Sequence, residues 1–89
     1  MNYYVYLIVS IFPNRKTISY VGYTINLKKR IILHNKSKGA KFTKGKKWYL
    51  AYFRRYDTKN MAMKEEYKLK KNFFVRNKIK KKFLDKYYK

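Results

Sequence analysis

The stretch YYVYLIVSIFPNRKTISYVGYT, residues 3–24, decides the fold because two apolar segments in it flank a turn signal. Residues 3–11 and 18–24 are rich in aromatic and β-branched side chains, which are typical of strands. The sequence PNRK between them is typical of a turn. The stretch therefore predicts an antiparallel hairpin. Gly22, inside the second strand, indicates either a bulge or a close approach of another group to the backbone.

A helix, a loop and a third strand are expected next. Asn26 is a favourable N-cap for a helix that runs to about residue 35. Residues 35–47 are rich in lysine and contain two glycines, which is typical of a loop. Residues 48–54, WYLAYFR, predict the third strand.

The last third of the chain is expected to be helical. Asp57 or Thr58 can cap a helix that runs to about residue 71, and a basic helix is expected at 74–87. The resulting order is β-β-α-β-α-α. It predicts an α+β fold, in which helices flank a small three-stranded antiparallel sheet. A chain of 89 residues is long enough for one compact core, so we expect a single domain over 1–89.

The charge of the chain indicates a polyanionic partner. Lys and Arg number 25 against 4 Asp and Glu, which gives a net charge of +21 at pH 7. Aromatic residues make up 20% of the chain, whereas disordered chains are poor in them. We therefore expect a folded domain with a densely cationic surface. Nucleic acid is the favoured partner, and an anionic membrane surface, reached through the basic helix 74–87, is the weaker alternative.

Several classes of site are excluded by composition. The absence of Cys excludes disulfides, zinc–thiolate sites and thiol nucleophiles, and the single histidine excludes a multi-histidine metal site. The apolar opening of the chain is too short to span a bilayer, and no small-residue cleavage site follows it. We therefore expect a protein that is not secreted and acts in the cytoplasm or nucleus, wherever its nucleic acid is.

The first predicted helix carries Arg30 and His34 one turn apart. Both fall on the stripe of Leu27 and Ile31, at the margin of the face expected to contact the core. Arginine is rarely placed there without a partner. The alternatives are an arginine whose stem covers apolar surface while its head reaches water, and a histidine with a purely structural role.

The second predicted helix carries a carboxylate on its apolar face. Glu66 shares a stripe with Ala62 and Leu69, whereas Glu65 lies on the wetter side and is expected to pair with lysines. An acid on the apolar stripe needs a cation, either Arg30, a lysine or a metal ion. A partly buried ion pair and a metal ligand both fit this position.

The tyrosines of the hairpin are the remaining polar candidates. Tyr4 and Tyr6 share one face of their strand, and Tyr20 can approach them from the neighbouring strand. Most of the tyrosines are expected to pack as half-buried strand residues. Two phenols near an arginine and a single acid could nevertheless supply a proton acceptor and hydrogen-bond donors to phosphate oxygens.

These residues, in this order, resemble the GIY-YIG nuclease superfamily. Tyr4-Val5-Tyr6 looks like its first tripeptide and Tyr20-Val21-Gly22 like its second. Arg30, His34 and Glu66 match the family's catalytic arginine, the histidine that follows it and the metal-binding glutamate. The resemblance covers about residues 3–71 and is closest to small single-domain members and to the catalytic domain of structure-specific junction nucleases. Tyr4 stands where the name-giving glycine would be, and a chain without Cys cannot carry the zinc domain of the junction nucleases.

The resemblance implies a metal-dependent DNA endonuclease that hydrolyses phosphodiester bonds. Glu66 would hold one Mg²⁺, for which Mn²⁺ can substitute, and Arg30 would stabilise charge on the phosphoryl oxygens. Tyr6 would be the general base, with Tyr20 as the alternative, and His34 would orient Tyr6 or share its proton. Neighbouring cations are expected to lower the pKa of Tyr6. The supporting residues would be Tyr4, Gly22, Thr24 and Asn77.

The lysines would bind the phosphates of the DNA and hold it near the site. Phosphate contacts position DNA without specifying its sequence, so recognition of branches, flaps or nicks, as in repair and recombination, is expected. A protein partner could supply further specificity. Phe42 and Trp48 could stack on an unpaired base, although core packing is the favoured role of Trp48. The alternative function is a non-catalytic nucleic-acid-binding domain on a nuclease-like fold. The expected phosphate contacts are Lys36, Lys38, Lys41, Lys44, Lys46, Lys47 and Lys70.

Overall fold

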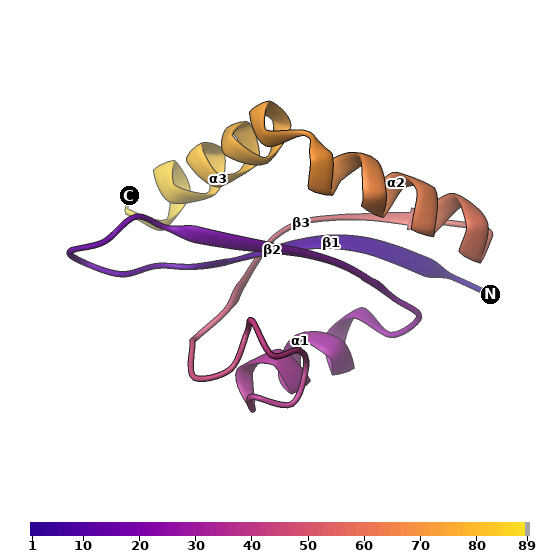
Figure 1. Ribbon diagram of the computed structural model, residues 1–89, viewed down its shortest axis with the longest axis horizontal. Helices are drawn as coiled ribbons and strands as arrows, with labels where there is room; N and C mark the ends of the chain where they lie inside the picture. The colour runs from indigo at the N-terminus through magenta and orange to yellow at the C-terminus, as the bar shows by residue number, and fades with distance from the viewer. Residues whose placement is uncertain (89) are drawn as a thin grey trace.

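The computed structural model describes residues 1–88, and Lys89, the last residue of the predicted domain, lies outside this part of the chain. Three strands and three helices follow the predicted order β-β-α-β-α-α (Figure 1). The α+β fold class is therefore confirmed. The elements are β1 (Tyr3–Ser10), β2 (Ile18–Thr24), α1 (Leu27–Asn35), β3 (Tyr49–Tyr56), α2 (Lys59–Lys71) and α3 (Phe73–Tyr87).

The sheet has β1 in the centre, paired antiparallel with β2 on one side and β3 on the other. Residues 5–10 of β1 are buried, as expected for a central strand covered on both faces. The pairing of β1 with β2 is continuous and places Tyr6 opposite Gly22. Gly22 is therefore not a bulge. The irregularity in the sheet lies between β1 and β3, at Leu7 and Ile8.

The two faces of the sheet are covered by different elements (Figure 1). The helices α2 and α3 lie over one face, and α1 with the loop that follows it lies under the other. Val5, Leu7 and Val9 pack on the α2–α3 side together with Ala62, whereas Tyr6 and Ile8 pack on the α1 side. The alternation of side chains along β1 thus sends the phenol of Tyr6 toward α1, where the predicted stripe of Arg30 and His34 lies.

Side chains at the helix ends fix where the helices begin. The Asn26 side chain accepts from the N–H of Lys29, 3.1 Å away, at the start of α1, and Thr58 rather than Asp57 caps α2. Thr24 is the last residue of β2, and its hydroxyl accepts from the N–H of Asn26 at 3.2 Å. Its role in the structure is to join β2 to α1 in a tight connection, which sets the position of that helix against the sheet.

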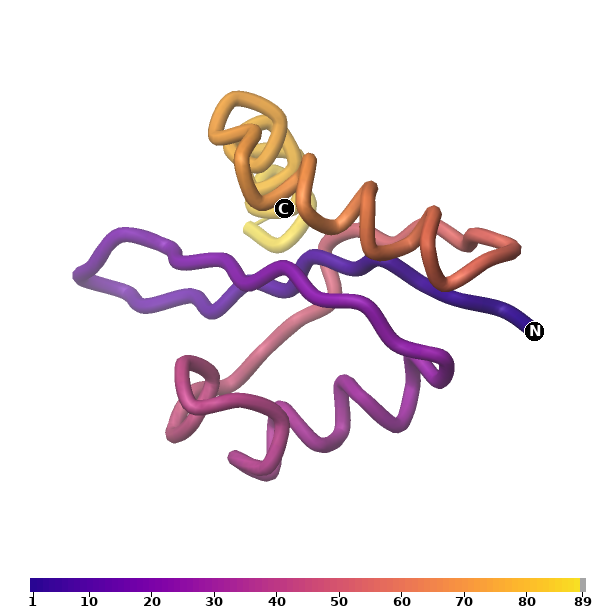
Figure 2. Tube along the Cα trace, turned by 45° about the vertical axis from the view of Figure 1, so that its right-hand side comes forward, coloured from indigo at the N-terminus to yellow at the C-terminus, as the bar shows by residue number. Residues whose placement is uncertain are grey.

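The chain turns sharply between α2 and α3 (Figure 2). Asn72 ends α2 and caps α3, because its side chain accepts from the N–H of Val75 at 3.1 Å. The last helix therefore begins one residue earlier than the predicted 74–87. Ile79 and Phe83 of α3 pack against the core on the same face of the sheet as α2.

Trp48 connects the long loop to the core. It is 2% exposed, and its indole N–H donates to the Thr43 carbonyl at 2.9 Å. The Asn35 side chain binds both the backbone N–H and the carbonyl of Trp48, at 2.7 and 3.1 Å. Because both backbone groups of Trp48 are bound to Asn35, β3 begins at Tyr49 and not at 48. Core packing is thus the observed role of Trp48.

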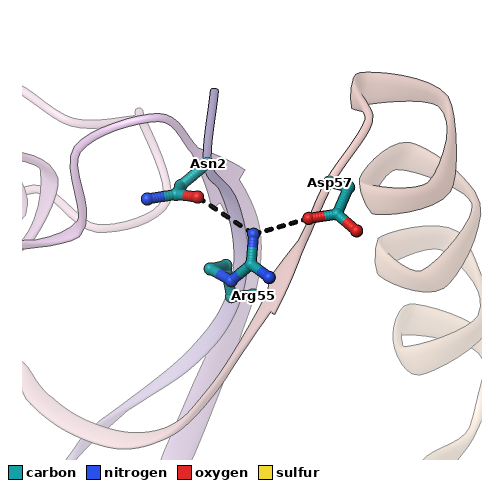
Figure 3. A network of polar contacts seen from close by, with 3 residues as sticks. All are labelled: Asn2, Arg55 and Asp57. Carbon is teal, nitrogen blue, oxygen red and sulfur yellow. Dashed lines mark hydrogen bonds and ion pairs between the residues drawn. The ribbon is translucent and has the colours of Figure 1, made fainter.

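Arg55 connects the N-terminal end of the sheet to the start of α2 through hydrogen bonds (Figure 3). Its Nη1 donates to the Asn2 side chain at 2.9 Å and to the Asp57 carboxylate at 2.7 Å. Both sides of the ion pair are exposed, so its contribution to stability is small.

None of the helices within residues 1–88 is long and apolar enough to cross a membrane.

Candidate functional site

Tyr6 lies directly against the backbone of Gly22. A Cβ atom at residue 22 would overlap the Tyr6 hydroxyl and would lie 2.7 Å from Cζ. The ring of Tyr6 is fully buried. The predicted close approach to the backbone at Gly22 is therefore confirmed, and the group that approaches is the phenol of the opposite residue on β1.

The phenol oxygen of Tyr6 is held by two residues of α1. Tyr6 Oη lies 2.7 Å from His34 Nε2, and it accepts from Arg30 Nε at 3.4 Å. A second nitrogen of Arg30, Nη2, donates to the Gly39 carbonyl at 3.1 Å. The predicted core-facing positions of Arg30 and His34 are therefore confirmed. The Arg30 head group contacts protein atoms rather than reaching only water.

Thr43 fixes the proton on the other side of the His34 ring. Thr43 Oγ1 lies 2.9 Å from His34 Nδ1 and 3.0 Å from the Ala40 carbonyl, to which its hydroxyl donates. We assign the single hydroxyl proton to Ala40, which makes the oxygen the acceptor for a proton on His34 Nδ1. His34 Nε2 is then the acceptor, and the hydroxyl of Tyr6 donates to it.

Gly39, in the loop after α1, lies directly against the His34 ring. A Cβ atom at residue 39 would overlap His34 Nδ1 and lie 2.7 Å from Cε1. Together with its carbonyl bond to Arg30, this makes Gly39 a contact of both helix residues. Sequence reasoning did not select Gly39 or Thr43 as site residues, because it interpreted residues 35–47 as a phosphate-binding loop. The signal present in the sequence was a glycine-containing loop with a threonine shortly before Trp48.

Burial determines the protonation of this cluster. Desolvation, followed by the positive charge of Arg30, lowers the pKa of His34 to about 4, so the imidazole is neutral at pH 7. Desolvation also raises the pKa of Tyr6, although the hydrogen bond and charge of Arg30 act in the opposite direction. The expectation that neighbouring cations lower the pKa of Tyr6 is therefore wrong for the protein alone. Burial is the larger effect.

Glu66 approaches the cluster from α2, the helix that lies on the other face of the sheet (Figure 1). Its side chain is 18% exposed, which confirms the inward position predicted from its stripe. Of the cations considered as partners, Lys70 is the one observed, with Nζ 3.7 Å from Oε2. Glu66 lies near enough for its negative charge to raise the pKa of Tyr6. Glu65 pairs with Lys68 at 3.5 Å, as expected for the wetter side.

The surroundings of Glu66 suit a cation that needs few protein ligands. Its contact with Lys70 is too long for a hydrogen bond, so the carboxylate oxygens are available. Within residues 1–88, no three His, Cys, Asp or Glu side chains gather into a metal-binding group. A single carboxylate fits Mg²⁺ or Mn²⁺, because Mg²⁺ keeps several of its water ligands and is often bound through one or two carboxylates.

Tyr20 extends the cluster toward the surface. Its ring meets the edge of His34 with centroids 5.3 Å apart, and it stacks on Phe42 at 6.1 Å with an interplanar angle of 20°. Tyr4 lies further along β1, where its ring contacts Phe53. Asn77 lies partly buried on α3 and takes part in none of the hydrogen bonds around Tyr6.

The lysines predicted to bind phosphate have different surroundings. Lys46 folds back, because its Nζ donates to the Phe42 carbonyl at 3.0 Å and lies 5.4 Å from the centre of the Phe42 ring. Lys70 pairs loosely with Glu66. The other five predicted lysines are exposed in the segment that follows α1. They are Lys36, Lys38, Lys41, Lys44 and Lys47.

Comparison with known proteins identifies the family. The family model described as the GIY-YIG catalytic domain matches residues 2–83, which is nearly the whole chain. The chain belongs to the GIY-YIG family. The resemblance noted from the two tripeptides, Arg30, His34 and Glu66 is thereby confirmed. This family consists of endonucleases that generally depend on a divalent metal.

Relatives with similar sequences carry names that state no activity. A UPF0213 protein from Pediococcus pentosaceus is 48% identical over 52 residues, which are 57% of this chain and 55% of that protein. A UPF0213 protein from Staphylococcus saprophyticus is 46% identical over 52 residues, which are 57% of this chain and 63% of that protein. The chain thus spans between half and two thirds of the length of these relatives. The solution structure of a UPF0213 protein from Bacillus halodurans is 33% identical, with a TM-score of 0.47, over 88% of this chain and 80% of that one.

We predict that His34 makes the protein less stable in mild acid. Its folded pKa of about 4 lies below the ordinary value of about 6.5, so the unfolded chain binds the proton more tightly. The free energy of unfolding should therefore fall as the pH is lowered from about 7 toward about 4. Arg30 is the charged group that acts on His34, and it contacts the same phenol oxygen. Urea unfolding at several pH values should show this slope, and His34→Gln should lose it. An unchanged slope in the variant would contradict the assignment.

We also predict that Thr43 selects the tautomer of His34. Thr43→Val keeps the shape but leaves His34 Nδ1 without its partner, which should cost about 1–3 kcal/mol of stability. Imidazole nitrogen spectra of the unaltered protein should show the proton on Nδ1. Thr43→Ser, which keeps the hydroxyl, should retain this tautomer, whereas Thr43→Val should give a mixture. A proton on Nε2 in the unaltered protein would overturn the assignment.

Proposed function

We propose that this chain is a divalent-metal-dependent DNA endonuclease that hydrolyses phosphodiester bonds. The observation that supports it most directly is the contact of the Tyr6 hydroxyl with His34 at 2.7 Å and with Arg30 at 3.4 Å, in a member of an endonuclease family. Glu66 supplies a nearby carboxylate. A surface of net charge +21 would attract DNA to this site.

Arg30 is the group placed to stabilise charge on the phosphoryl oxygens. Its Nε and one Nη2 proton are used by Tyr6 and Gly39, so three of its five N–H donors remain for phosphate. These two bonds hold the guanidinium in position before the substrate arrives. A preorganised donor of this kind is worth about 10²–10³-fold in rate, because negative charge develops on the oxygens in the transition state.

Tyr6 and His34 are placed to move the proton of the attacking water. Since burial keeps Tyr6 protonated, Tyr6 Oη would accept the water proton while its own proton passes to His34 Nε2. The water O–H bond breaks as the new P–O bond forms and the P–O bond to the leaving oxygen breaks. That oxygen takes a proton from solvent, His34 keeps the proton received from Tyr6, and no free phenolate is required. Thr43 supports this relay because it keeps Nε2 unprotonated at the start. Tyr20, which is partly exposed, is the alternative proton acceptor.

Glu66 would hold the divalent ion, as Mg²⁺ or Mn²⁺. When bound, such an ion supplies a Lewis acid that stabilises charge on the phosphoryl group and the leaving oxygen. Lys70, loosely paired with Glu66 at 3.7 Å, can turn away from the carboxylate without breaking a hydrogen bond.

Substrate choice would follow the shape of the DNA. The exposed lysines contact phosphates, which carry no sequence information. We therefore propose that branched, flapped or nicked DNA is preferred, as in repair or recombination, with a protein partner as a possible further source of specificity. The protein would act in the compartment that holds this DNA, the cytoplasm or the nucleus.

The second candidate is a nucleic-acid-binding domain without catalysis. The observation that favours it is the complete burial of Tyr6, which keeps the hydroxyl away from bulk water. A purely binding domain would use the same cationic surface. The two functions differ in whether Glu66 and Arg30 affect turnover.

We predict that Glu66→Gln lowers the cleavage rate by about 10²-fold or more, because the carboxylate that would hold the ion is lost. The measurement is cleavage of junction, flap, nicked and plain duplex DNA with Mg²⁺ or EDTA. Glu65→Gln is the matched control, since it removes the same charge from the partly exposed neighbour, and it should stay within about threefold. Cleavage that survives Glu66→Gln or EDTA would falsify this proposal. DNA binding without cleavage in the unaltered protein would favour the second candidate.

A further inference from the structure

A hollow of about 300 Å³ lies beside the candidate site. This volume is at the lower end of the range of small-ligand sites. Two of its residues connect it to the site, since Tyr20 contacts His34 and Lys70 pairs with Glu66. The hollow therefore adjoins two residues of the candidate site, His34 and Glu66. Its lining residues are Ser19, Tyr20, Val21, Phe42, Lys70 and Arg76.

The wall of the hollow formed by α2 and α3 is cationic. Arg76 Nε is buried and has no hydrogen-bond partner within residues 1–88. The Lys70 side chain is 49% exposed, and its carboxylate contact is loose. None of the residues that line the hollow is acidic. Two cations therefore line one small space, and Arg76, whose guanidinium lies over the Phe73 ring, keeps one donor without a partner. Phosphate oxygens are well suited to satisfy them, because guanidinium binds phosphate through parallel hydrogen bonds.

The wall formed by β2 and the loop is aromatic. Phe42 is 51% exposed, although it stacks on Tyr20 with centroids 6.1 Å apart. Tyr20 in turn meets the edge of the buried His34. The aromatic rings thus run from the hollow to the hydroxyl of Tyr6. Lys46 lies over the Phe42 ring, but it is a flexible side chain that a planar group could displace. A nucleobase is a planar group of this kind.

We propose that this hollow binds one unpaired nucleotide next to the scissile phosphate. Arg76 and Lys70 bind the phosphate of that nucleotide, and its base packs against Phe42. A base inside a duplex is stacked on both faces, so it cannot offer a face to Phe42, whereas a base in a flap or single strand can. The substrate class is therefore DNA with an unpaired nucleotide at the point of cleavage. The position of the scissile phosphate rests on the proposed function, but binding in the hollow does not.

The test measures binding without cleavage. Labelled blunt duplex DNA and the same duplex with a single-stranded extension are titrated with protein in EDTA, at about 150 mM salt, and anisotropy is recorded. Arg76→Gln and Phe42→Leu should each weaken binding of the extended DNA by about tenfold, because one stacked or phosphate-bound contact is lost. Binding of the blunt duplex should change by less than about threefold.

Two matched variants serve as controls. Arg54→Gln removes the same charge from an exposed position on β3, and Phe74→Leu removes an exposed ring from α3. Both should leave the preference for extended DNA unchanged. Equal losses on both DNAs, or no loss in Arg76→Gln and Phe42→Leu, would overturn the inference. Urea unfolding of each variant checks that it is folded.

Cleavage by the unaltered protein separates this inference from the proposed function. If the protein cleaves DNA but the hollow variants keep their preference, the inference fails and the proposed function stands. If it does not cleave but the hollow variants lose their preference for extended DNA, the proposed function fails and the hollow remains a binding site.

Discussion

The hydrogen bond between Tyr6 Oη and His34 Nε2 is the contact on which the rest of the site depends. It joins the central strand to α1, and both partners are fully buried. Buried polar groups need partners, so the opposite nitrogen of His34 requires Thr43. The rings leave no space for side chains at Gly22 or Gly39. The bond between Tyr6 and His34 thus explains why glycine stands at 22 and 39 and threonine at 43, on β2 and in the loop after α1.

Burial also sets the chemistry of this bond. In water, an isolated phenol and imidazole would have pKa values of about 10 and about 6.5. Here desolvation raises the pKa of Tyr6 and lowers that of His34 to about 4. The pair is therefore neutral, although Arg30 is a direct neighbour. When the phenol takes the water proton as it gives its own to His34 Nε2, the phenol stays neutral and the positive charge goes to the imidazole, which is what the proposed relay requires.

The fold and the inward positions of three site residues could be predicted from the sequence, because both follow from local sequence patterns. Helical periodicity placed Arg30, His34 and Glu66 on inward faces, because residues three and four apart share a side of a helix. The contacts of Gly39 and Thr43 with the His34 ring depend on how the loop folds back, which no periodic pattern records. The direction of the Tyr6 pKa was predicted wrongly for the same reason, since desolvation follows from tertiary packing. The break between the last two helices near residue 72 was predicted, but the capping of α3 by Asn72 is visible only in the structure.

The most direct measurement of the central claim is single-turnover DNA cleavage by Tyr6→Phe and Tyr20→Phe. Each variant removes one oxygen and keeps the ring, so packing against Gly22 or Phe42 is retained. If the buried hydroxyl carries the water proton to His34, Tyr6→Phe should lose at least about 10²-fold in rate, and Tyr20→Phe less than about tenfold. Full activity in Tyr6→Phe, with loss in Tyr20→Phe, would contradict the account and transfer the role to the partly exposed phenol.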